Sequence, residues 1–191
     1  MIFSLSLAGC ASTPTVKRLS PADAIDLSGR WNDEDSRLVS EELIQQSLSS
    51  GWAEKYRRDR GRLPAVIVGR VKNMTYEHIN SETFMKDIER ALLNSGLINF
   101  VASSAERDEI RSEREDMQTW ASIDTRSSLG RESGADYMIR GIISSIYDEE
   151  AGKRVVYYQI DLSLIDLEDN IIIWAGQKSI KKLIKRPLFS F

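Results

Sequence analysis

One short N-terminal motif carries residue types suited to covalent chemistry. Leu7, Ala8 and Gly9 precede Cys10, which is the only cysteine of the chain. A signal peptidase needs small side chains beside the bond that it cuts, and transfer of a diacylglycerol needs a thiol nucleophile. The motif therefore predicts a bacterial lipoprotein whose mature, acylated N-terminus is Cys10. Residues 1–9 then form a truncated signal peptide that lacks its basic start, and the alternative is a chance cysteine in a short apolar stretch.

Residue types that perform catalysis are otherwise sparse. His78 is the only histidine, which excludes a multi-histidine metal site. The acidic runs 33–35 and 148–150 fall where we expect a helix N-terminus and a hairpin turn, and the helix dipole and solvation explain them. Neither a glycine-rich phosphate loop nor a G-x-S-x-G motif is present. We therefore predict a protein that is not an enzyme, with no cofactor, metal or small-molecule substrate.

Aromatic residues in polar surroundings suggest a surface for protein contact. Tyr157 alternates with Gln159 and Asp161 on the less apolar face of an expected strand, and Trp31 lies in a polar run before an expected helix. Protein interfaces are enriched in tyrosine and tryptophan within a polar rim. These four residues are the candidate partner-binding residues. The alternatives are an ordinary solvated sheet face for the strand residues and a partly buried cover of the core for Trp31.

Composition limits the remaining classes. A chain of 191 residues with 41% hydrophobic residues buries one core, so we expect a single domain. The formal charge of −3 argues against a nucleic-acid binder. Two basic clusters could face anionic lipid or glycan, but we favour the explanation that they are solvated charges of loops and an edge strand. They are Lys55, Arg57, Arg58, Arg60 and Arg62, and Lys178, Lys181, Lys182, Lys185 and Arg186.

The first two thirds of the chain read as alternating helices and short strands. After a flexible tether over residues 10–25, the spacing predicts a helix from Asn32 or Asp33 to about Gly51, a strand over 65–71, and a helix from Asn80 or Ser81 to about residue 95. A strand over 98–101 leads into Ser103-x-x-Glu106, a capping box for a charged surface helix. A further helical piece is expected over 123–132, ending at Gly134.

The last third has the period of β-strands. Residues 137–147, 154–165 and 171–180 predict three strands joined by turns over 148–153 and 166–170. The predicted fold class is α/β: a mixed sheet with an early parallel β-α-β unit and a C-terminal antiparallel three-stranded meander, flanked by about four helices. The globular domain is expected over 26–185, followed by a tail over 186–191.

Several segments together resemble a known family. The segments are DLSGRWNDEDSRLV (26–39), VIVGRVKN (66–73), EHINSETFMKDIERALLNSGLINFVAS (77–103), LGRESGADYMIRGIISSI (129–146), VVYYQIDLSLIDLEDN (155–170) and WAGQKSIKKLIK (174–185). Through them the chain is similar to the LpoB family of outer-membrane lipoproteins, the penicillin-binding protein activators.

The resemblance implies a function as well as a fold. It implies a domain related to the periplasmic parts of CsgG and TolB, without enzymatic activity, that stimulates a bifunctional class A penicillin-binding protein. The lipid anchor maps onto Cys10, and the following Ala11 and Ser12 look similar to signals for the outer membrane. The alternative is a structural or accessory envelope lipoprotein, such as a CsgG-like secretion component, that shares the fold but not the partner.

Overall fold

The computed structural model describes residues 16–20, 23 and 25–185. The elements in chain order are α1 (Asp33–Ser49), α2 (Trp52–Arg60), β1 (Ala65–Asn73), α3 (Ser81–Asn94), β2 (Asn99–Phe100), α4 (Ser104–Trp120), β3 (Tyr137–Glu150), β4 (Lys153–Asp166) and β5 (Ile172–Lys185). The predicted signal peptide, Cys10 and the C-terminal tail lie outside the described residues, as does part of the predicted tether.

One mixed sheet organises the domain, in the strand order β2-β1-β3-β4-β5. β1 runs parallel to β2 and to β3, and the crossover from β1 to β2 contains α3. β3, β4 and β5 form an antiparallel meander of long strands. The predicted α/β fold with a parallel unit and a C-terminal meander is therefore confirmed.

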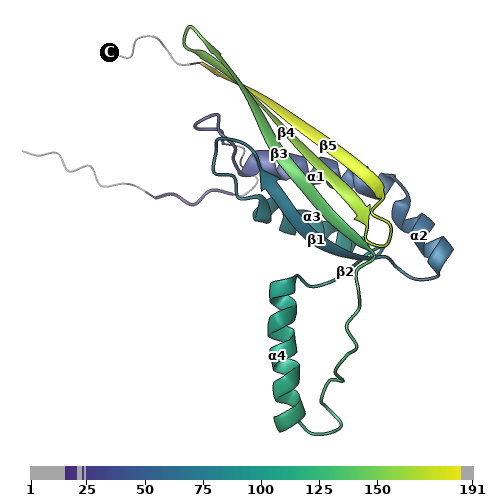
Figure 1. Ribbon diagram of the computed structural model, residues 1–191. Helices are drawn as coiled ribbons and strands as arrows, with labels where there is room; N and C mark the ends of the chain where they lie inside the picture. Colours follow the sequence, from purple (N-terminus) through teal and green to yellow (C-terminus); the bar gives the residue numbers. More distant parts are fainter. Residues whose placement is uncertain (1–15, 21–22, 24, 186–191) are drawn as a thin grey trace, which may run out of the picture.

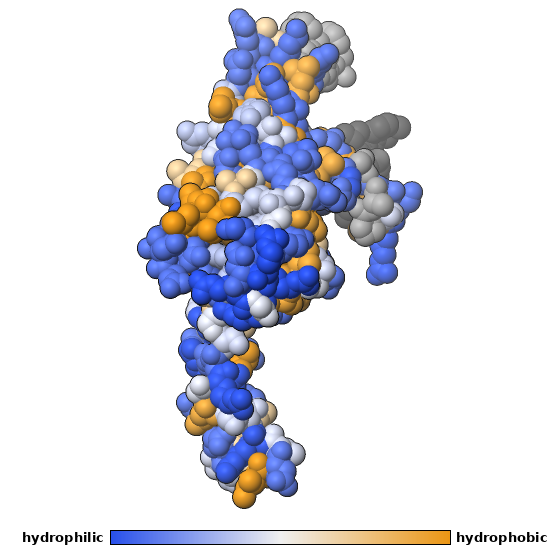
Figure 2. Space-filling model, turned by 90° about the vertical axis from the view of Figure 1, so that its right-hand side faces the viewer, coloured by the Kyte–Doolittle hydropathy of each residue, from blue (hydrophilic) through white to orange (hydrophobic). Residues whose placement is uncertain are grey.

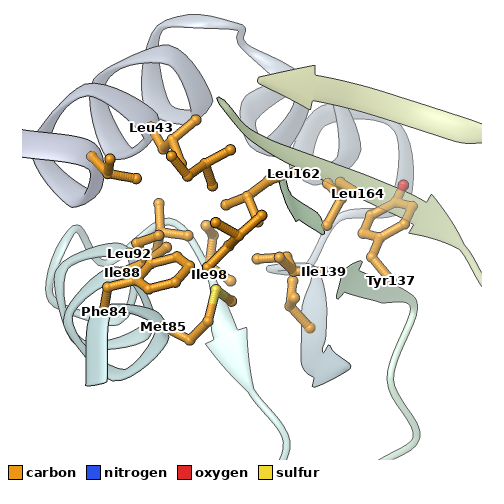
Figure 3. Close-up of a cluster of buried hydrophobic side chains, with 14 of the residues drawn as sticks. Leu43, Phe84, Met85, Ile88, Leu92, Ile98, Tyr137, Ile139, Leu162 and Leu164 are labelled. Carbon is orange, nitrogen blue, oxygen red and sulfur yellow. The ribbon is translucent and has the colours of Figure 1, made fainter. Parts of the chain in front are cut away.

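The core lies between the sheet and the helices α1 and α3, which cover one face of it (Figure 1). β4 supplies a run of alternate side chains to this core, and α3 supplies an apolar stripe that faces them (Figure 3). The fully buried members include Val39, Leu43, Val66, Phe84, Ile143, Val156, Tyr158, Ile160, Leu162 and Leu164. Because side chains of a strand alternate between faces, the residues between these on β4 must lie on the other face of the sheet.

Local capping signals are realised as the sequence predicts. Asn32 caps α1 in a capping box with Asp35, and Asn80 accepts a hydrogen bond from the backbone N–H of Glu82 at the start of α3. Ser103 forms a second capping box with Glu106 at the start of α4. These caps satisfy backbone N–H groups that a helix leaves without partners in its first turn.

Three local predictions were wrong. Residues 123–132 form turns and irregular backbone rather than a helix, so Gly134 is not a helix cap. Most of the first basic cluster lies on the helix α2, which we did not predict, rather than in a loop or strand. The acidic run 148–150 continues β3, and only residues 151–152 form the hairpin turn.

The surface helix α4 stands away from the body of the domain (Figures 1 and 2). None of its residues is buried. It is joined to the following loop by ion pairs from Arg111 and Arg114 to Glu132, and to α3 by an ion pair between Lys86 and Glu106. No helix in the described part of the chain is both long enough and apolar enough to cross a membrane.

Candidate functional site

The face of the sheet opposite α1 and α3 carries the predicted strand residues. In Figure 1 this face is turned toward the viewer, and no labelled helix lies in front of it. We call it the open sheet face and define it by Ile142, Ile146, Tyr157, Gln159, Asp161, Lys181 and Leu183, from the three meander strands. The sequence therefore located three of its members correctly on one face of β4.

The strand register arranges these side chains in rows across the meander. Ile146 on β3 lies opposite Tyr157 on β4, and Tyr157 lies opposite Lys181 on β5. Two rows further along the same face, Ile142 lies opposite Asp161. Directly opposed residues on antiparallel strands have Cβ atoms about 4.5–5.5 Å apart, so these side chains form one continuous surface.

A chain of hydrogen bonds orders the middle of the open sheet face. The Tyr157 hydroxyl donates to Gln159 Oε1 at 3.3 Å, and Gln159 Nε2 lies 3.1 and 2.9 Å from the two carboxylate oxygens of Asp161. All three side chains are half-buried. Their rotamers are thus restrained before any partner arrives, which lowers the entropic cost of binding.

Exposed aliphatic side chains flank this polar strip. Ile146 is 66% exposed, Leu183 is 58% exposed and Ile142 is 39% exposed. An apolar patch beside ordered polar groups on a preformed surface is the composition of a protein-binding site. Sequence reasoning missed these three residues, although the period of two along β3 and β5 would have placed them on this face.

Trp31 lies on the other side of the sheet. Its indole packs edge-on against Tyr158, with ring centroids 5.5 Å apart, and its Nε1–H donates to Ser36 Oγ at 2.9 Å. Tyr158 is fully buried and points away from the open sheet face, because it directly follows Tyr157 on β4. The structure therefore separates Trp31 from the other three candidate residues and seats it as a cover of the core.

The residues that the structure describes contain no group of three or more histidine, cysteine, aspartate or glutamate side chains placed to hold a metal ion. His78 is exposed in the loop between β1 and α3. The open sheet face offers apolar contact, hydrogen bonds and the charge of Lys181.

Comparisons with known proteins give one family match. The sequence profile described as "Peptidoglycan-synthase activator LpoB" matches residues 35–180. A search of curated proteins finds no match. Tyr157, Gln159 and Asp161 lie inside the matched segment, whereas Trp31, Lys181 and Leu183 lie outside it.

Several solved structures are similar at low sequence identity. The LpoB C-terminal domain from Salmonella enterica is 18% identical, with 78% of this chain and 99% of that chain covered and a TM-score of 0.38. The LpoB C-terminal domain from Escherichia coli is 15% identical over the same shares, with a TM-score of 0.39. Lipoprotein GNA1162 from Neisseria meningitidis is 12% identical over 63% of this chain and 83% of that chain, also with a TM-score of 0.39.

Proposed function

Because the chain belongs to the LpoB family of peptidoglycan-synthase activators, we propose that it activates a bifunctional class A penicillin-binding protein by docking through the open sheet face. The family match over residues 35–180 is the observation that carries this proposal. The match includes the polar strip of β4 and the two isoleucines of β3.

Activation without chemistry requires a preference for one state of the partner. A bound protein shifts the partner toward its active conformation only by its difference in affinity for the two conformations. A rigid docking surface suits this task, since a flexible one would fit both conformations. The hydrogen-bonded strip from Tyr157 to Asp161, on a strand paired on both sides, is such a surface.

The proposal also covers the location of the protein in the cell envelope. Acylation of Cys10 anchors it in the outer membrane with the domain in the periplasm, as the lipidation motif indicates. The described residues of the predicted tether, 16–20, 23 and 25, are all exposed. Exposed chain with few apolar contacts is suited to linking a domain to a membrane surface.

Affinity measurements with paired variants test the docking surface. Tyr157→Ala should weaken binding of a purified class A synthase by about 2 kcal/mol, or roughly 30-fold, as expected for a tyrosine at the centre of an interface. Ile146→Ala should also weaken binding. Leu129→Ala is the matched control, because Leu129 is 57% exposed in the loop after α4, away from the meander.

The same variants define the contrary outcome. Thermal unfolding of Tyr157→Ala and Ile146→Ala should stay close to that of the parent protein. Unchanged affinity for the synthase in both variants would refute docking through this face. If the parent protein binds no class A synthase and crosslinked envelopes instead yield secretion subunits, the activator function itself is wrong.

A further inference from the structure

A cleft on the helix-covered side of β4 has the residues of a ligand site. A cavity of about 480 Å³ is lined by Arg30, Trp31, Tyr76, Glu77, Tyr147 and Arg154, together with His78 and Glu149. A second cavity, also of about 480 Å³, shares Arg30, Glu77 and Arg154 with the first. We call the two adjoining cavities the Glu77 cleft. Ligand sites in proteins are commonly concave, with aromatic walls and a few fixed polar groups.

The Glu77 carboxylate fixes the walls of the cleft. Its Oε1 accepts hydrogen bonds from the hydroxyls of Tyr158 at 2.8 Å and Tyr147 at 3.1 Å, and its Oε2 accepts one from the backbone N–H of Trp31 at 3.0 Å. Burial raises the pKa of the Tyr158 hydroxyl, and the bond to Glu77 raises it further. Both carboxylate oxygens are thus occupied by protein donors, and Glu77 holds the rings in place.

The aromatic side chains of the Glu77 cleft extend to its solvent-exposed mouth. Tyr76 is 94% exposed, and its ring centroid lies 6.0 Å from that of Tyr147 at a tilt of 55°. The Tyr147 hydroxyl is fixed by Glu77, so its ring presents a face at a set angle. An almost fully exposed tyrosine beside a fixed ring offers a flat apolar platform at the mouth of a cavity.

Cationic donors remain at the same mouth. Within the described residues, no hydrogen bond or ion pair engages the guanidinium of Arg30. Arg154 Nε donates to Glu149 Oε2 at 2.6 Å, and its Nη2 lies 2.5 Å from the same oxygen in an ion pair, which leaves its Nη1 group for another acceptor. Guanidinium groups recognise carboxylates through paired N–H groups. The preferred ligand therefore combines a carboxylate with a flat apolar face and hydrogen-bonding groups around it.

We propose that the Glu77 cleft binds a carboxylated amino-sugar unit of a peptidoglycan glycan strand. A sugar ring has an apolar C–H face that stacks on tyrosine, and the lactyl carboxylate of a muramic acid residue that carries no stem peptide supplies the anion. The choice of peptidoglycan as the glycan rests on the proposed function; the chemistry of an acidic sugar rests on the cleft alone. The cleft and the open sheet face lie on opposite sides of β4, so one molecule can hold glycan and synthase together.

Calorimetry with defined fragments tests the glycan site. The probes are the peptide-free disaccharide of N-acetylglucosamine and N-acetylmuramic acid, whose lactyl carboxylate is free, the neutral N-acetylglucosamine dimer and the free stem peptide. The parent protein should bind the acidic disaccharide, bind the neutral dimer more weakly and not bind the peptide. Arg30→Gln should weaken binding of the acidic disaccharide about tenfold or more, as loss of a charged hydrogen bond does. Tyr76→Ala should weaken binding of both sugars.

Matched controls separate the site from general charge. Arg126→Gln removes another exposed arginine, in the loop after α4, and should leave sugar binding unchanged. Tyr76 and Arg30 are exposed, so their variants should fold as the parent does.

The outcomes also separate this inference from the proposed function. Absence of sugar binding, equal binding of the free peptide, or binding unaffected by Arg30→Gln and Tyr76→Ala would each overturn the glycan site. Sugar binding by a protein that binds no synthase would support the site and refute the activator function. Loss of synthase binding in Arg30→Gln with no sugar binding by the parent would identify the cleft as a protein contact and overturn the proposal.

Discussion

Substitution of Lys182 should destabilise the domain more than substitution of an exposed lysine. Lys182 Nζ lies 2.7 Å from Asp35 Oδ2 and 2.8 Å from Asp26 Oδ2, and it donates to the carbonyl oxygen of Arg30 at 2.9 Å. The Lys182 side chain is 11% exposed and that of Asp35 is 5% exposed. This contact ties the N-terminus of α1 and the segment before it to the edge strand β5.

The expected loss of stability follows from the burial of Asp35. Lys182→Met leaves that carboxylate buried with only the backbone N–H of Asn32 as a partner, and removal of one member of a buried ion pair costs about 3–5 kcal/mol. The half-exposed Asp26 adds little. Lys181→Met is the control, because Lys181 is exposed on the opposite face of β5 and should change the free energy of unfolding by less than about 0.5 kcal/mol.

Urea denaturation measures the free energy of unfolding of both variants. The dependence of this free energy on pH is a second test. Burial lowers the pKa of Lys182, but the hydrogen bonds to Asp26 and Asp35 outweigh burial and raise the pKa above its usual value. The stabilisation is therefore complete below the pKa of the unfolded lysine and is lost as the pH rises through the folded pKa. The parent protein should lose more stability in this alkaline range than Lys182→Met, because the buried tyrosines, whose pKa values burial raises, lower the stability of both proteins there. A loss below about 1 kcal/mol for Lys182→Met, or an equal loss for Lys181→Met, would refute the reasoning.

Two further predictions concern the Asp136 carboxylate and the acylation of Cys10. Burial would raise the pKa of Asp136, but hydrogen bonds from Arg62 and from the backbone N–H of Ala65 lower it to about 2 from 3.8, so its contribution is present above pH 3.8 and lost as the pH falls toward 2. Asp136→Asn should cost about 2 kcal/mol at neutral pH and flatten the acid limb of a urea-unfolding profile, and an unchanged acid limb would contradict this. Metabolic labelling with palmitate should mark the parent protein and not Cys10→Ala, and equal labelling would disprove lipidation at Cys10.

The elements that could be predicted from the sequence are those with a local signal. The caps at Asn32, Asn80 and Ser103 mark three helix starts, and alternation along β4 separates Tyr157 from Tyr158. Each signal depends only on residues close in sequence, so it can be recognised without knowledge of the tertiary fold.

The wrong predictions depend on contacts distant in sequence. Helix α2 has only Trp52, Ala53 and Tyr56 buried, and Trp52 and Tyr56 both pack edge-on against Tyr137, more than 80 residues later. Residues 123–132 have no such support: Ile123 and Leu129 are 78% and 57% exposed. A short helix without a buried face is unstable in water.

The wrong prediction for the end of β3 also depends on a contact with another strand. The acidic residues Glu149 and Glu150 look like turn residues, yet they lie opposite Arg154 and Lys153 on β4. Opposite charges in directly opposed positions stabilise an antiparallel pair, so the hairpin continues to its two-residue turn. The partner strand, rather than the local composition, decides where β3 ends.

The two proposed binding sites can be tested independently because consecutive residues of one strand serve different sides of the sheet. Tyr157 points to the open sheet face, and Tyr158 donates to Glu77 behind it. On β5, Lys181 faces the open side and Lys182 holds Asp35. A variant at Tyr157 or Lys181 should therefore change synthase binding while glycan binding and stability persist. If Tyr157→Ala also abolished glycan binding, the sites would be coupled through β4, and effects of substitutions in the two sites would not add.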